Sequence, residues 1–219
     1  MIVFQPFWIA FLIILCVSIL GYLRVEHNRR LHAFFQFFYN SGFANLLYRE
    51  RFGLSNPISS FLSVVFILIV SLFCIQINLF FVKGGYFLFD LLSLFIICLL
   101  LLLIYTIKIL FLKLIGFIIQ QKEIISEYLF NIILINQGVG IFLIPVVIFL
   151  AYGKEDIKST AVFSGIIIIA MSFIFRIVRG LMLSRNHKNI STFYLFLYLC
   201  AFEFLPLLLG IKLFIENEN

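Results

Sequence analysis

Long, unbroken apolar runs constrain the fold of this chain more than any other feature of its sequence. Residues 96–105 read IICLLLLLIY and residues 164–175 read SGIIIIAMSFIF, without the alternation of polar and apolar residues that barrel strands show. Hydrophobic residues make up 64% of the chain and charged residues 12%, whereas a soluble domain has roughly 45–50% and about 25%. Because backbone polar groups in hydrocarbon must pair within the protein, we predict an all-α fold, a polytopic transmembrane helical bundle.

Hydropathy windows of about 19 residues predict six membrane spans. They cover residues 7–23, 57–81, 86–105, 128–151, 160–182 and 191–214. Together they predict a single integral membrane domain over 1–219. No Lys or Arg precedes the first run, and the basic residues follow it instead. The first run is therefore expected to be a retained helix rather than a cleaved signal peptide.

The distribution of basic residues predicts the orientation of the spans. With the N-terminus outside, 12 of the 16 Lys and Arg residues lie on the inner side. The other four are Lys83, Lys154, Lys158 and Lys212. Since inner loops are enriched in Lys and Arg, we predict that both termini lie outside. The same bias accounts for the net charge of +6 without a nucleic-acid partner, and the lipid bilayer is the expected surrounding.

Two segments on the predicted inner side of the membrane are not expected to cross it. Residues 24–56 combine crowded aromatic residues with flanking charges, a pattern typical of an amphipathic helix in the membrane interface. Its expected interfacial residues are Arg29, Arg30, Phe34, Phe38, Arg49 and Arg51. The alternative is a docking surface for a cytoplasmic or membrane partner. Residues 108–127 are expected to form an amphipathic helix or a helical hairpin, and residues 152–159 a short outer loop.

Ionisable residues within the last two predicted spans form a candidate intramembrane site. Glu203 lies about midway along the sixth span, and Pro206 leaves a nearby backbone carbonyl without its usual partner. Arg176 and Arg179 lie one turn apart near the inner end of the fifth span. An Arg176–Glu203 pair could lock two helices together, or the carboxyl could belong to a proton path, an ion path or a partner contact.

The fourth predicted span, INQGVGIFLIP, carries both amides and small residues. Asn136 and Gln137 are expected to face the bundle interior, as is Asn131 farther back along the chain. The residues that favour close helix packing or a kink, in this span and the sixth, are Gly138, Gly140, Pro145 and Pro206. The same residues can open a helix so that it lines a cavity, and both interpretations stay open.

Enzyme and cofactor motifs are missing from the sequence. It has no HExxH, GxSxG or P-loop pattern, and its His and Cys residues do not have metal-ligand spacing. No cofactor or metal is therefore predicted, and the chain is interpreted as non-enzymatic. A membrane enzyme with an unfamiliar constellation remains an alternative.

The stretch FRIVRGLMLSRNHKNISTFYLFLYLCAFEFLPLLLG resembles the C-terminal signature of a domain-of-unknown-function family of small inner-membrane proteins of the Bacteroidota. The matching positions are Arg176, Arg179, Gly180, Tyr198, Leu199, Cys200, Glu203 and Pro206. The Asn-Gln-Gly and Pro145 stretch of the fourth span is also similar. The resemblance implies a bacterial inner-membrane location and adds weight to Glu203 and Arg176, but it implies no activity.

Three functions are compatible with these features. The first is a non-enzymatic subunit or accessory factor of a larger cell-envelope assembly of the secretion, motility or lipid-export type, with a membrane-protein partner. The second is a small proton- or ion-coupled transporter that uses Glu203 and Arg176. The third is a lipid-modifying membrane enzyme, which requires a polar cluster at one membrane interface.

Overall fold

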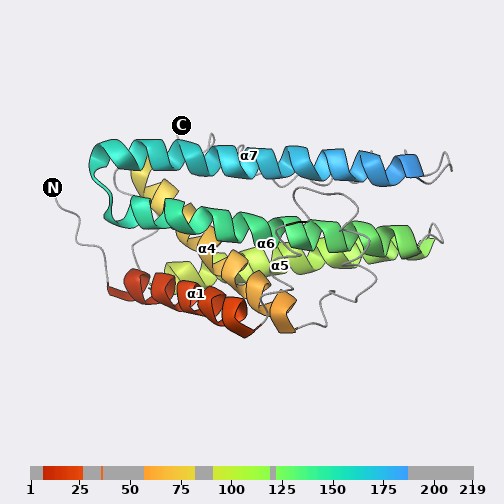
Figure 1. The fold of residues 1–219 in the computed structure, drawn as a ribbon, viewed down its shortest axis with the longest axis horizontal. Coiled ribbons are helices and arrows are strands. Elements are labelled where there is room, and N and C mark those ends of the chain that lie inside the picture. The colour runs from red at the N-terminus through yellow and green to blue at the C-terminus, as the bar shows by residue number, and fades with distance from the viewer. Residues whose placement is uncertain (1–6, 27–35, 37–56, 82–90, 119–121, 187–219) are drawn as a thin grey trace. The chain divides into compact units, whose positions relative to one another are not determined.

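A computed structural model describes residues 7–26, 36, 57–81, 91–118 and 122–186. These residues form five α-helices (Figure 1) and contain no strand. The helices are α1 (Phe7–Glu26), α4 (Pro57–Phe81), α5 (Leu91–Ile118), α6 (Lys122–Tyr152) and α7 (Glu155–Asn186). Each is long and apolar enough to cross a membrane. The predicted all-α class is therefore confirmed for the described residues.

Five of the six predicted spans overlap these helices, although most of their bounds differ. Helix α4 has the predicted bounds, and α5 continues beyond Phe111 to Ile118. The described residues within 108–127 therefore belong to the end of α5 and the start of α6. The sixth predicted span, 191–214, lies outside the described residues. The interfacial segment 24–56 also does, apart from the end of α1 and Gln36.

The predicted loop over residues 152–159 is wrong in length, because α6 ends at Tyr152 and α7 begins at Glu155. The Gly153 amide donates to the Phe149 carbonyl at 2.8 Å and closes the last turn of α6. Glu155 and Asp156 occupy the first turn of α7, where negative charge stabilises the positive end of the helix dipole. These residues look like a polar loop in the sequence because a helix start and a loop have similar composition.

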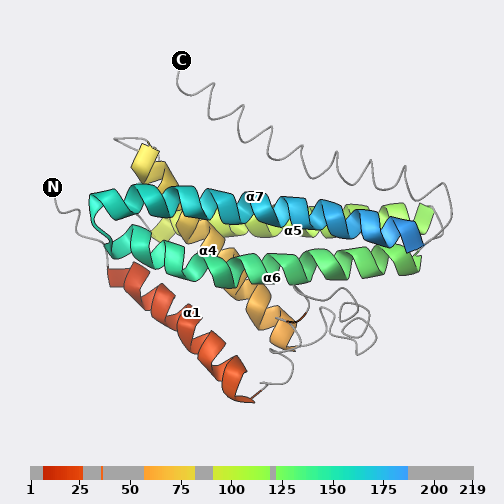
Figure 2. The same cartoon turned by 45° about the horizontal axis from the view of Figure 1, so that its top comes forward.

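The chain divides into two compact units, residues 1–172 and 173–219. In the first unit, successive helices run in opposite directions (Figures 1 and 2), so that α4 and α6 run the same way. Helix α6 is the central element, with 72% of its membrane span buried, whereas only 6% of the α5 span is buried. Helix α6 therefore organises the packing, and α5 presents its side chains outward.

The core of the first unit contains a regular stripe of α4 side chains. Leu62, Val65, Ile69 and Leu72 are all buried, and their alternating spacing of three and four residues places them on one helix face. Ile9, Ile13 and Cys16 of α1 belong to the same apolar cluster as three of them, Val65, Ile69 and Leu72. The helices of this unit therefore pack through continuous side-chain stripes.

Candidate functional site

A buried polar contact joins α4 to α6 near the start of α4. The Gln137 Nε2 atom donates to the Ser59 carbonyl at 2.9 Å, to the Ser59 Oγ at 2.8 Å and to the Ser63 Oγ at 3.0 Å. The Ser63 hydroxyl in turn donates to the Ser59 carbonyl at 2.8 Å. Because an amide nitrogen has only two hydrogens, the three acceptors share them. Interhelical bonds of this kind stabilise packing where no water is present.

Gly140 lies one turn beyond Gln137 and allows a close approach of α4 to α6. A Cβ atom at Gly140 would lie 2.8 Å from the Phe66 Cα and 3.0 Å from its Cβ. The Phe66 ring also lies 6.5 Å from the Tyr105 ring of α5, centroid to centroid. Gly138 is buried nearby on α6, whereas Pro145 lies inside the helix with its side chain exposed. The α4–α6 crossing therefore depends on a glycine beside a hydrogen-bonding amide.

Two other amides of α6, Asn131 and Asn136, are buried as well. They are 6% and 5% exposed. The Asn131 Oδ1 and the Gln137 Oε1 have no hydrogen-bond partner among the described residues, whereas Asn136 has an interaction partner. The amides predicted to face the interior are thus buried, and only Gln137 is shown bonding across helices.

Two buried polar residues of α4, Ser71 and Gln76, were not predicted from the sequence. Gln76 is 5% exposed, and neither of its amide atoms has a hydrogen-bond partner within the described part of the chain. Ser71 accepts a contact from the Cys98 Sγ of α5 at 3.0 Å. Gln76 continues the spacing of the buried α4 stripe, and that periodicity could have revealed its position. The serines, in contrast, are common in spans and carry no separate signal.

Arg176 and Arg179 lie on α7 in the second compact unit. The Arg176 Cζ lies 5.0 Å from the centroid of the Phe173 ring, and the Arg179 Cζ lies 5.6 Å from that of Phe175. Each guanidinium therefore has an aromatic face within cation–π range on its own helix. Both side chains are half-buried and have further partners.

The remaining candidate residues lie outside the described part of the chain. Glu203 and Pro206 are among them, so the Arg176–Glu203 pair stays a prediction. The same holds for the expected interfacial residues Arg29, Arg30, Phe34, Phe38, Arg49 and Arg51. In the described ranges, no three His, Cys, Asp or Glu side chains are grouped as metal ligands.

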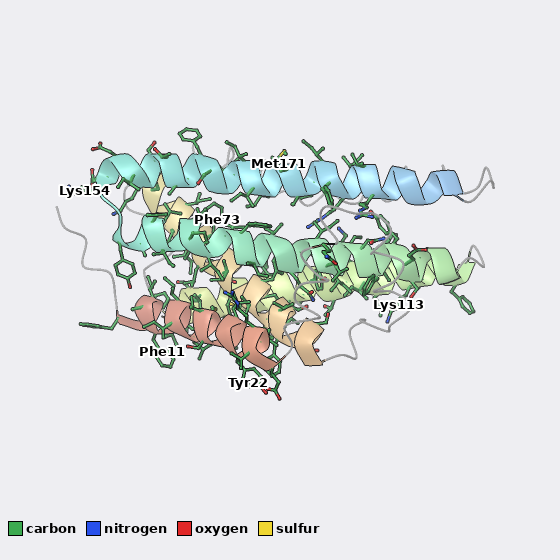
Figure 3. All side chains as sticks on the ribbon, viewed as in Figure 1. Phe11, Tyr22, Phe73, Lys113, Lys154 and Met171 are labelled. Carbon is green, nitrogen blue, oxygen red and sulfur yellow. The ribbon has the colours of Figure 1, made fainter. Side chains whose placement is uncertain are left out.

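The α5–α6 hairpin carries an exposed apolar stripe, defined here as Leu103, Ile107, Leu110, Leu114 and Phe117 of α5. Each of these side chains is at least half exposed, and Phe117 is 69% exposed. Their three- and four-residue spacing places them on one face. Lys113 also lies on this part of α5 (Figure 3). On another side of the hairpin, Gly116 approaches Ile125 of α6, so the two arms are closely packed.

These features define a class: a polytopic α-helical membrane protein whose helices pack through apolar stripes, a close glycine contact and buried amides. The chain belongs to the family described as Domain of unknown function (DUF4271), which matches residues 9–214. The predicted membership of a domain-of-unknown-function family is thereby confirmed. Comparisons with curated proteins and with solved structures gave no match.

Proposed function

We propose that this protein is a non-enzymatic subunit or accessory factor of a larger assembly in the bacterial cell envelope, of the secretion, motility or lipid-export type. The observation that carries this proposal is the exposed apolar stripe on α5, which extends past the charged residues of that helix. Its occupant would be a helix of a membrane-protein partner.

The length of α5 supports this interpretation. Its 28 residues correspond to about 42 Å at ~1.5 Å per residue, whereas the hydrocarbon core of a bilayer is about 30 Å thick. Lys108 and Lys113 lie toward its C-terminal end, and charged side chains are costly within hydrocarbon. This end of α5 is therefore expected at the membrane interface, by our proposal on the cytoplasmic side.

The stripe continues beyond Lys108 through Leu110, Leu114 and Phe117. Lipid chains can cover Leu103 and Ile107, but they do not cover large apolar side chains beyond the hydrocarbon core. Exposed apolar surface in such a place is typical of a protein-binding site. The face has the helical spacing by which an amphipathic or transmembrane helix docks.

The polar contacts of α6 support a structural role over transport. Gln137 hydrogen-bonds Ser59 and Ser63, and Gly140 closes the α4–α6 contact. These residues serve helix packing rather than lining an open path. A transporter using Glu203 and Arg176, or a lipid-modifying enzyme, requires residues outside the described part, and no described contact favours either.

Photo-crosslinking in native membranes tests the proposed docking face. A photoreactive residue placed in turn at Leu110, Leu114 and Phe117 should give one protein adduct of the same mass at all three positions. The control position is Ile104, which is 41% exposed on another face of α5 and should give lipid adducts only. Leu114→Asp should abolish the adduct from Phe117. Lipid adducts alone at every position would overturn the proposal.

The proposed orientation, with both termini on the outer side of the inner membrane, has a separate test. Lys113 lies on α5 and Lys154 lies between α6 and α7, and both are exposed. A membrane-impermeant maleimide added to intact spheroplasts should label Lys154→Cys and not Lys113→Cys, and inverted vesicles should give the reverse. The opposite pattern would invert the topology without affecting the docking face.

A further inference from the structure

The exposed stripe of α5 is part of a longer seven-residue repeat. Ile96 and Leu100 precede it on the same face, and they are 45% and 55% exposed. From residue 96 to residue 117 the spacing alternates strictly between four and three residues. This is the a and d pattern of a coiled coil, which here extends over about 32 Å of helix at ~1.5 Å per residue. The residues of this seam are Ile96, Leu100, Leu103, Ile107, Leu110, Leu114 and Phe117.

The opposite face of α5 follows the same repeat and attaches the helix to its own bundle. Cys98, Tyr105 and Leu112 lie seven residues apart on this face. The Cys98 thiol donates to the Ser71 Oγ of α4 at 3.0 Å. The Tyr105 ring lies 6.5 Å from the Phe66 ring of α4, and Leu112 is 1% exposed. Because this face is held by the bundle, the seam on the other side points away from it.

We propose that a second copy of this chain occupies the seam, so that two α5 helices pack as a parallel pair about a twofold axis along the membrane normal. This inference rests on the proposed function, because it names the partner of the same α5 face. The larger assembly would then be built from pairs of this chain.

The membrane favours a second copy as the occupant. Two copies inserted in the same direction have parallel α5 helices at equal depth, so each seam residue meets its own counterpart across the twofold axis. A heptad seam paired with itself keeps a against a and d against d over its full length. Its 3.5-residue period corresponds to the left-handed crossing of about 20° that is common among membrane helices. This geometry accommodates large side chains, whereas the close right-handed crossing needs small residues.

The charges of α5 are compatible with such a pair. The charged residues of this helix are Lys108 and Lys113, and neither belongs to the seam. Lys113 flanks the seam beside Leu114. In a parallel pair the twofold axis places the two Lys113 side chains on opposite edges of the interface, so like charges do not meet. The pair is therefore formed without placing a charge at any a or d position.

The area of the seam is sufficient for a stable dimer. Pairing these half-exposed side chains would cover roughly 600 Å² on each copy, or about 1,200 Å² in all, which is the lower end for stable protein interfaces. Leu110, Leu114 and Phe117 follow Lys108 toward the membrane interface, where water is present and the hydrophobic effect favours their burial. This end of the seam is expected to contribute most to pairing.

Disulfide crosslinking in native membranes tests the pair. The chain is expressed in two forms with different affinity tags, its native cysteines are replaced by alanine, and one cysteine is introduced at a time. On oxidation with copper phenanthroline, Leu103→Cys and Leu110→Cys should each give a disulfide dimer that carries both tags. The matched control is Leu102→Cys, because Leu102 is 50% exposed against 51% for Leu103 but lies off the seam. This control should give no dimer above background.

A pair of charge variants keeps the test independent of misfolding. Leu110 is 70% exposed, so Leu110→Glu and Leu110→Lys should both fold. Each variant expressed alone should lose the copurification of the two tags, because like charges then face each other at one d position. Coexpression of Leu110→Glu in one tagged form with Leu110→Lys in the other should restore copurification.

Several results would overturn the inference. Equal dimer formation from Leu102→Cys and Leu103→Cys would indicate random collision, and charge variants that copurify alone, or that fail to restore copurification together, would show that the helices do not meet at Leu110. An α5 adduct with a different protein would assign the seam to that protein and leave the proposed function standing. Lipid adducts alone along the stripe would overturn both.

Discussion

The close contact between Gly140 and Phe66 gives the sharpest prediction about how this bundle is held together. In the variant Gly140→Ala, the new methyl group would lie 2.8 Å from the Phe66 Cα and 3.0 Å from its Cβ. Carbon atoms pack optimally at about 3.5–4.0 Å, so α4 and α6 must separate locally by roughly 0.7–1.2 Å. The Phe66 Cα belongs to the backbone and cannot rotate out of the way.

The magnitude of the effect can be isolated with a matched control. Overpacking of this kind costs about 1–3 kcal/mol, while replacing a helical glycine by alanine gains about 1 kcal/mol of helix propensity. Gly21 of α1 is also helical, and a Cβ there would meet nothing within 4 Å. The difference between Gly140→Ala and Gly21→Ala therefore removes the propensity term. We expect Gly140→Ala to be less stable than Gly21→Ala by about 1–3 kcal/mol.

Reversible unfolding in mixed detergent micelles, followed by circular dichroism, measures this difference. The two variants and the wild-type protein are titrated with sodium dodecyl sulphate under the same conditions, and their free energies of unfolding are compared. If Gly140→Ala proves as stable as Gly21→Ala, or more stable, then the helices are not in close contact at Phe66 and the reasoning is refuted.

Three further predictions concern other contacts of the first unit. A methyl group at Gly165 of α7 would collide with the Phe73 ring of α4, so Gly165→Ala should destabilise the protein. Phe73→Leu should relieve this collision. A double-mutant cycle should therefore give an interaction energy of about 0.5–3 kcal/mol between the two positions. Gln137→Leu removes the hydrogen bonds to α4 and should lower the free energy of unfolding by about 0.6 kcal/mol, and by no more than about 2, as for other bonds between membrane helices. An unchanged value in the micelle titration would mean that these bonds are not formed. Gln76→Leu should have the opposite sign, leaving stability unchanged or raising it, because it replaces a buried amide that has no partner among the described residues; a clear loss of stability would show that Gln76 has a polar partner.

The membrane spans were predictable because each depends only on the apolar residues of its own segment. A run of about 20 apolar residues crosses the hydrocarbon as a helix whatever its neighbours do. The bounds of α4 follow from its apolar run alone, whereas the loop at 152–159 was mispredicted because Glu155 and Asp156 favour a helix start as readily as a loop. Residues 108–127 had two possible forms in the sequence, and the described residues among them belong to two separate helices, α5 and α6.

The candidate site was less predictable because its members are far apart in sequence. Gln137 was identified as an inward-facing amide, but nothing local indicates that its partners are Ser59 and Ser63, more than 70 residues earlier. Serine is tolerated almost anywhere in a span, so its presence did not predict a contact. Glu203, the strongest candidate by sequence, lies outside the described residues, and its role stays a prediction.

The sequence by itself determined the solvent of this protein, its helical class and its membership of a family, because each depends on composition or on residues close together in the chain. Only the tertiary structure decided which helix is central, where α4 and α6 touch, and which apolar faces are left uncovered. The reason is that all five described helices are apolar around most of their circumference. When lipid and protein are equally favourable surroundings for an apolar side chain, periodicity cannot say which face packs. Only the packed structure shows the close contact at Gly140, the hydrogen bonds of Gln137 and the uncovered stripe of α5.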